Sequence, residues 1–166
     1  MSVIDLNNLK EQVQTVLQAQ NTTTASILNL SNNLTTQITK VFKKHPRHLV
    51  GQASEFPCVT VFLDGKDMDN TSIAPNQRTQ GRRRADIRVN IAGLMWDNNF
   101  VSNDDDEAED DIEALMENIE EILRNDYTLG GTVDWIKPES VEYFTMYGND
   151  SNLLTGVLAM RASKFY

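Results

Sequence analysis

The sequence contains very few of the residues from which disulfides, metal centres and membrane spans are built. Its 166 residues include one cysteine, Cys58, which excludes an internal disulfide and a cysteine-rich metal site. No apolar run approaches the roughly 20 residues of a membrane-spanning helix. The opening stretch MSVIDLNNLK lacks the basic and apolar regions of a signal peptide. We therefore expect a globular protein without a membrane partner, in line with its 40% hydrophobic and 23% charged residues.

Residues that carry catalysis or bind metals are equally sparse. His45 and His48 have no third ligand nearby in the sequence, which favours a solvated turn over a metal site. Asp104 and Asp106 fit the start of a calcium-binding loop, but Ala108 occupies the third ligand position and no glycine follows. There is no glycine-rich phosphate loop and no nucleophile paired with a base. We expect no enzyme, no metal and no cofactor.

Charge is unevenly distributed along the chain. The 24 acidic and 15 basic residues give a net charge of -9, which argues against a general nucleic-acid binder. Residues 101–126, however, hold 12 of the acidic residues and one basic residue, a net charge of -11, and leave +2 for the rest. The chain is a nearly neutral body with one acidic segment, and such an asymmetry concerns binding partners rather than the fold.

Two helices are predicted in the first third of the chain. Residues 3–20 carry one apolar stripe at helical spacing. A second stripe predicts a helix over residues 24–44, which must stop before Pro46. The members of this stripe are Ile27, Leu30, Leu34, Ile38, Val41 and Phe42. Both stripes are narrow, so each helix needs a sheet or a neighbouring subunit to lie on. We divide the chain into an N-terminal helical extension, residues 1–23, and an α+β domain, residues 24–166.

The remainder of the chain is predicted to form strands around one helix. β-Branched and alternating segments predict strands at residues 56–63, 85–95, 132–136, 140–147 and 153–166. A polar connection over 64–84 joins the first two, and an amphipathic helix over 110–125 precedes the third. The last strand is more continuously apolar, as expected of a strand covered on both faces. This order predicts an α+β fold in which amphipathic helices pack on a mixed, mostly antiparallel sheet with a long inter-strand loop and an extra N-terminal helix. The single strand–helix–strand crossover is expected to supply one parallel or edge pairing.

Two oppositely charged segments are the candidate contact sites. The long loop carries an arginine cluster, Arg78, Arg82, Arg83 and Arg84. The acidic partner face comprises Asp105, Asp106, Glu109, Asp110, Glu113 and Glu117. Loops longer than about 15 residues are usually functional or disordered, so this one is either solvated or an arm that becomes ordered on phosphates or on the acidic helix of another copy. Opposite patches on one chain suit a head-to-tail contact that closes into a ring.

The order of these segments resembles one known family. A proline-led strand (FPCVTVFL), a long loop, an alternating strand (GRRRADIRVNIAG), an acidic amphipathic helix (EDDIEALMENIEEILRND) and a terminal β region (LLTGVLAMRASKFY) follow one another. This arrangement is similar to that of the tail terminator, or tail completion, proteins of tailed bacteriophages. The resemblance covers residues 27–166 and concerns architecture, without a diagnostic motif. Residues 3–20 look like an addition to the family pattern that reaches a neighbour in the particle.

The resemblance implies a structural virion protein without catalytic residues. Such a protein forms a ring, usually a hexamer, on the tail tube, where it ends tube polymerisation and provides the docking surface for the head and neck. Its partners would be its own copies, the tail tube protein and neck or connector proteins, with DNA passing through the ring lumen without sequence-specific binding. The long loop would contact a neighbour or the tube. The location would be the tail or neck of a virion assembled in the host cytoplasm.

Two other functions remain open on the sequence. Another head-tail connector or neck (head completion) protein would also form a ring in the same particle but would bind a different partner. An acidic regulatory or DNA-mimic protein, whose carboxylates copy phosphate spacing, belongs to a different class. The arginine cluster counts against the mimic, and a ring in solution would separate the two classes.

Overall fold

The sheet and both of its helices are described by a computed structural model of the chain. It describes residues 4–19, 40–49, 57–69, 84–96, 105–147 and 152–165. Within them, a five-stranded sheet has the order β1-β2-β3-β5-β4. Its strands are β1 (Lys40–Phe42), β2 (Cys58–Asp69), β3 (Arg84–Trp96), β4 (Trp135–Tyr147) and β5 (Asn152–Phe165). Only β1 and β2 pair in parallel, and the other three pairings are antiparallel.

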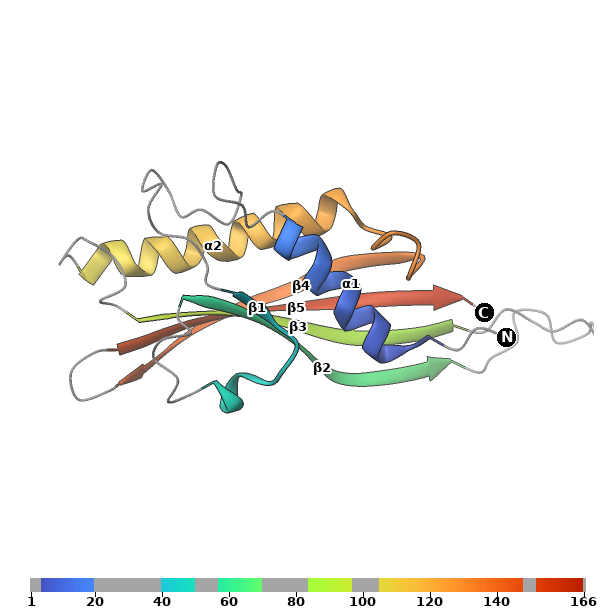
Figure 1. Cartoon of the computed structure of the whole chain (residues 1–166), viewed down its shortest axis with the longest axis horizontal. Helices are drawn as coiled ribbons and strands as arrows, with labels where there is room; N and C mark the ends of the chain where they lie inside the picture. The colour runs from blue at the N-terminus through green and yellow to red at the C-terminus, as the bar shows by residue number, and fades with distance from the viewer. Residues whose placement is uncertain are drawn as a thin grey trace, which may run out of the picture.

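Both helices lie on one face of this sheet. Helix α1 (Leu6–Ala19) crosses the strands, while α2 (Asp105–Asn125) runs along them, as Figure 1 shows. The short 3-10 helix η1 (Pro46–His48) lies on the opposite side of the sheet in the same view. The structure thus confirms the predicted α+β fold with a mixed, mostly antiparallel sheet.

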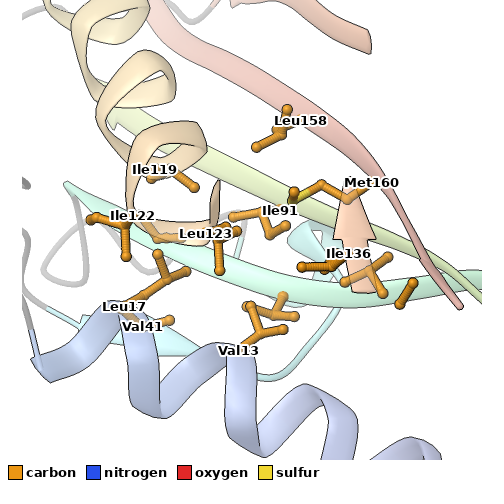
Figure 2. Close-up of a cluster of buried hydrophobic side chains, with 14 of the residues drawn as sticks. Val13, Leu17, Val41, Ile91, Ile119, Ile122, Leu123, Ile136, Leu158 and Met160 are labelled. Carbon is orange, nitrogen blue, oxygen red and sulfur yellow. The ribbon is translucent and has the colours of Figure 1, made fainter. Parts of the chain in front are cut away.

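The main core lies between the helices and the sheet. The apolar stripe of α1 buries Leu9, Val13 and Leu17 completely. That of α2 is buried along its whole length through Ile112, Leu115, Met116, Ile119, Ile122 and Leu123. Figure 2 shows the side chains of α1 and α2 meeting over those of the sheet. The sheet, rather than a neighbouring subunit, therefore supports the predicted stripe of residues 3–20, and the stripe of α2 packs on the same face, because these residues form one cluster with the strands.

Helix α2 approaches the sheet closely where two glycines face each other across strands. Gly93 of β3 pairs with Gly156 of β5. A β-carbon on Gly156 would stand 2.6 Å from Cγ of Met116, and one on Gly93 would stand 2.9 Å from Cδ2 of Leu115. Because glycine has no side chain, this pair leaves room on the sheet for Met116 and Leu115, which we call the glycine floor. It sets how closely α2 approaches the sheet.

The first helix is part of this core. Besides its buried stripe, Gln14 donates a hydrogen bond of 2.7 Å to the carbonyl of Val41, and the Val41 N–H donates one of 3.2 Å to Gln18. Lys43 forms an ion pair of 2.7 Å with Glu11. Helix α1 thus covers the outer edge of β1 as well as the sheet face. The predicted boundary at residue 23 falls outside the described residues.

The second predicted helix is wrong at its end. Lys40, Val41 and Phe42 form strand β1, in which Val41 pairs with Val59, and residues 24–39 of the prediction lie outside the described residues. The apolar pair Val41 and Phe42 continues a helical stripe in the sequence equally well. Tertiary contacts favour the strand: β1 pairs in parallel with β2, and the side chains of Gln14 and Gln18 hydrogen-bond the backbone C=O and N–H of Val41.

The long loop begins later than predicted, because β2 continues past Leu63 to Asp69. A bulge between Leu63 and Gly65 shifts the register, after which the polar residues still pair with β3. Arg88 of β3 supports this half with ion pairs to Asp64 at 4.0 Å and Asp67 at 3.8 Å. The connection itself, residues 70–83, lies outside the described residues.

Strand β4 is one strand rather than the two predicted. Its register shifts between Pro138 and Ser140, so the predicted break is a bulge within one strand. Proline is tolerated because β4 is at the edge of the sheet, where an N–H is not needed for a second neighbour. The strand–helix–strand crossover therefore ends in an edge strand, as expected, and β5 lies between β3 and β4.

Candidate functional site

The acidic face of α2 is exposed along its first half. Glu109, Asp110, Glu113 and Glu117 are exposed, and Asp105 and Asp106 belong to the first turn of the helix. Because the apolar stripe of α2 lies on the sheet, the four exposed carboxylates are directed away from it. Carboxylates in a first turn also favour the helix dipole. Four residues of the predicted acidic face, Glu109, Asp110, Glu113 and Glu117, therefore share one exposed surface of α2, and the side chains of Asp105 and Asp106 lie outside the described ones.

One row of this surface borders strand β4. Glu113, Glu117 and Glu120 follow helical spacing, and all three act on Tyr143 of β4. Partial burial raises the pKa of Tyr143 above its ordinary value, and the three carboxylates raise it further. Tyr143 extends over Gly156 next to Met116, on the α2 side of the sheet. The acidic row and this aromatic ring thus form one boundary between helix and edge strand.

A hollow of about 200 Å³ lies along this boundary. Its wall on the helix comprises Glu109, Ile112 and Glu113. Its wall on the sheet comprises Tyr143, Phe144, Thr145, Leu154 and Thr155. We refer to this hollow as the α2–β4 groove. Carboxylates, an aromatic ring and apolar side chains line it together, a combination that suits a cation with an apolar stem.

The outer edge of β4 has two unlike halves. In the first half, the Ile136 N–H donates to the carbonyl of Tyr127 at 2.7 Å, and Pro138 with its bulge interrupts the edge. The second half, residues 141–147, reads VEYFTMY and contains neither proline nor bulge. β5 pairs with the inner edge of these residues, and no strand among the described residues pairs with their outer edge, which we call the free edge of β4. Tyr143 and Phe144 in this half are 46% and 49% exposed, which is high for large apolar side chains.

Among the predicted arginines, the structure describes Arg84 alone. Its Nε lies 2.9 Å from Asp86, and its guanidinium stacks 5.5 Å from the ring centroid of Trp135. Asp86 also accepts a hydrogen bond from the hydroxyl of Ser163. Arg84 is therefore engaged within its own sheet. Arg78, Arg82 and Arg83 lie outside the described residues.

The structure separates Arg84, the one described arginine of the cluster, from the α2–β4 groove along the length of the sheet. Arg84 pairs with Phe165 at one end of β3, whereas Tyr143 pairs with Gly156, which pairs with Gly93. Arg84 and Gly93 are nine residue steps apart along β3, which corresponds to about 30 Å at 3.3 Å per residue. Figure 1 shows the same separation, since β2 ends at the right of the view and β4 at the left.

The arginines next to Arg84 cannot cross this distance within one chain. Arg82 is two residues from Arg84, so the chain reaches about 7 Å at most from that anchor. An extended arginine side chain adds a similar length, roughly 7 Å, which leaves about half of the separation uncovered. Any contact between Arg82 or Arg83 and Glu113 is therefore between copies.

His45 and Cys58, two residues whose types can bind metals or act in catalysis, have structural roles in the described chain. Within the described residues, no group of three potential ligands could hold a metal ion. His45 accepts the N–H of Arg47 at 3.2 Å and packs 4.8 Å from the ring of Phe62. Cys58 is completely buried. Among the helices of the described chain, none has the length and apolar character needed to span a membrane.

Comparison with protein-family models and with curated protein sequences finds no match. The sequence predicted Glu113 and Glu117 of the acidic row but not Glu120, nor that the row borders a strand edge with two exposed aromatic residues with which no described strand pairs. The alternating run around Tyr143 and Phe144 indicated a strand, whereas its position at the sheet edge depends on strand order, which has no local signal in the sequence.

Proposed function

We propose that this protein is a structural subunit that assembles head to tail into a ring, and that the ring caps the tail tube of a tailed bacteriophage. In this role it ends tube polymerisation and offers the docking surface for the neck. A hexamer is the ring size that the resemblance of residues 27–166 suggests. A different neck or head-completion ring of the same particle remains the second candidate.

One observation supports assembly above the others. Arg84 and the α2–β4 groove lie about 30 Å apart along one sheet, so the neighbouring Arg82 and Arg83 can meet Glu113 only between copies. A contact between two unlike patches is heterologous, and such contacts close into rings or extend into filaments. The charges would mainly set the orientation and the association rate of neighbouring copies.

The test is the mass of the purified protein by light scattering at several salt concentrations. We expect an assembly of several 18.8 kDa chains at low salt that loosens as salt is raised, because the screening length falls from about 10 Å at 0.1 M to 3 Å at 1 M. Electron micrographs of the same sample should show rings. The double variant Arg82→Glu, Arg83→Glu should assemble less well. The control variant Lys10→Glu, Arg47→Glu makes the same change of charge on α1 and η1 and should assemble normally.

The same measurement distinguishes the alternatives. A monomer or dimer at all salt concentrations would contradict the ring, and binding of that species to a DNA-binding enzyme would support a DNA mimic instead. An assembly that is insensitive to the two arginines would retain the ring but refute the charge contact. Addition of purified tail tubes then separates a terminator, which binds the tube end, from a neck protein, which does not.

A further inference from the structure

The free half of β4 and the acidic row of α2 lie side by side, and together they define what can bind there. An unpaired strand edge offers backbone N–H and C=O groups to an extended segment, which can then add to the sheet as a further strand. Side chains of an added strand alternate between the two faces. Those on the helix side would project over Tyr143, Glu113 and Glu117.

Charge excludes the simplest occupant, the same edge of a second copy. Two β4 edges paired about a twofold axis would bring together two acidic rows, each with Glu113, Glu117 and Glu120. Like charges placed opposite one another at an interface cost several kcal/mol. The edge of β2 is equally unsuited, because its free half carries a bulge at Gly65 and the charged residues Asp64, Lys66 and Asp67.

We propose that residues 141–147 of β4 accept an extended arginine-bearing segment as an added strand, with its guanidinium groups in the α2–β4 groove. The occupant is the segment 78–83 of a second copy, an identity that rests on the proposed head-to-tail assembly. This segment supplies Arg78, Arg82 and Arg83. Arg82 and Arg83 of the same copy cannot make this contact, because Arg84 is about 30 Å from the groove.

The groove fits an arginine side chain in three respects. Glu109 and Glu113 provide carboxylates for its planar fork of donors. The ring of Tyr143 provides a π face for the guanidinium. Ile112 and Leu154 provide apolar contact for the methylene stem, and the hollow of about 200 Å³ has room for such a group. Backbone pairing along β4 would supply affinity, and the arginines would select the partner.

The experiment uses a peptide with the sequence of residues 74–85, APNQRTQGRRRA, and the full-length variant Arg82→Glu, Arg83→Glu as receptor. The reversed charges stop the loop of one receptor copy from competing for the groove of another. We expect titration calorimetry to detect binding and amide exchange to show protection of residues 141–147. A peptide with glutamine in place of all four arginines is the control and should bind at least tenfold more weakly, because one charge pair contributes about that factor or more.

Two matched receptor variants locate the peptide. Glu113→Lys reverses a carboxylate in the groove, and we expect it to weaken binding about tenfold. Glu121→Lys makes the same charge change at an exposed position of α2 outside the groove. It should weaken binding by only about a factor of two, because salt screens most of the interaction between distant charges. Both positions are exposed, so neither substitution threatens the fold.

Equal effects of the two variants, or binding without protection of residues 141–147, would overturn the proposal. The outcome is separable from that of the proposed function. Rings that form without protection of this edge would retain the ring and refute the added strand. Peptide binding at the groove in a protein that forms no ring would retain the docking site and refute the ring.

Discussion

The packing of α2 on the glycine pair makes Gly156→Ala a sharp test of the fold. The new methyl group would stand 2.6 Å from Cγ and 3.0 Å from Sδ of Met116, and 3.2 Å from the ring of Tyr143. The nearest of these atoms is near the base of a completely buried side chain, so a rotation of its tip cannot relieve the clash. Overpacking of this kind costs about 1–3 kcal/mol, partly offset by roughly 0.5–1 kcal/mol because alanine suits a strand better than glycine.

Gly65→Ala is the matched control for this substitution. There the methyl group would stand 2.8 Å from the guanidinium nitrogen of Arg88, a similar approach. The obstacle is the tip of a flexible side chain that is 48% exposed, and its ion pairs with Asp64 and Asp67 are long and exposed. Such pairs contribute about 0–1 kcal/mol, so moving the arginine should leave stability within about 0.5 kcal/mol of the original.

Urea unfolding followed by circular dichroism measures both effects. We expect a net loss of about 1–2 kcal/mol for Gly156→Ala, and a fall in Tm of roughly 2–8 °C for a chain of this size. In the background Met116→Ala the same change should cost nothing, because the obstructing side chain is gone. An equal loss in both backgrounds, or an equal loss for Gly65→Ala, would show that α2 does not rest on the glycine floor.

Two further predictions concern α1. Leu17→Ala should cost about 2–5 kcal/mol in urea unfolding, as for other completely buried leucines, with Thr15→Ala as an exposed control. A loss below about 1 kcal/mol would show that α1 is an appendage after all. The second prediction concerns pH: the hydrogen bond and charge of Lys43 lower the pKa of Glu11 below its ordinary value of 4.5. This stabilisation is present above that value and is lost as pH falls through the lowered pKa, so Glu11→Gln should flatten the decline of Tm in that acidic range. Curves of unchanged steepness for Glu11→Gln and the original protein would contradict the link between α1 and Lys43.

Periodicity located most of the elements but failed where pairing outweighs local pattern. The stripes of α1 and α2 and the alternation of β3 were visible in the sequence, because one buried face leaves a regular trace. Residues 40–42 have no such trace, because three residues fit a helix and a strand equally well. Asp64–Asp69 was predicted to be a loop since a polar strand at a sheet edge is stabilised by pairing rather than by burial. Pro138 indicated a break, whereas an edge strand accommodates it as a bulge.

The candidate site was predictable in its charges and not in its form. The acidic row on α2 was found from the sequence, because a helix with one apolar stripe must direct its carboxylates away from the core. The partnership of that row with Tyr143 and the free edge of β4 was not, since it depends on which strand ends the sheet.

The sequence by itself determined the scarcity of cysteine and histidine, the split of charge into an acidic segment and a nearly neutral remainder, and the faces that the two helices bury. These are properties of composition and of short periods along the chain. Only the tertiary structure decided that the acidic row borders an edge with which no described strand pairs, and that Arg84 lies about 30 Å from it along the sheet. Strand order and register are long-range pairings, which no short segment of the sequence encodes by itself.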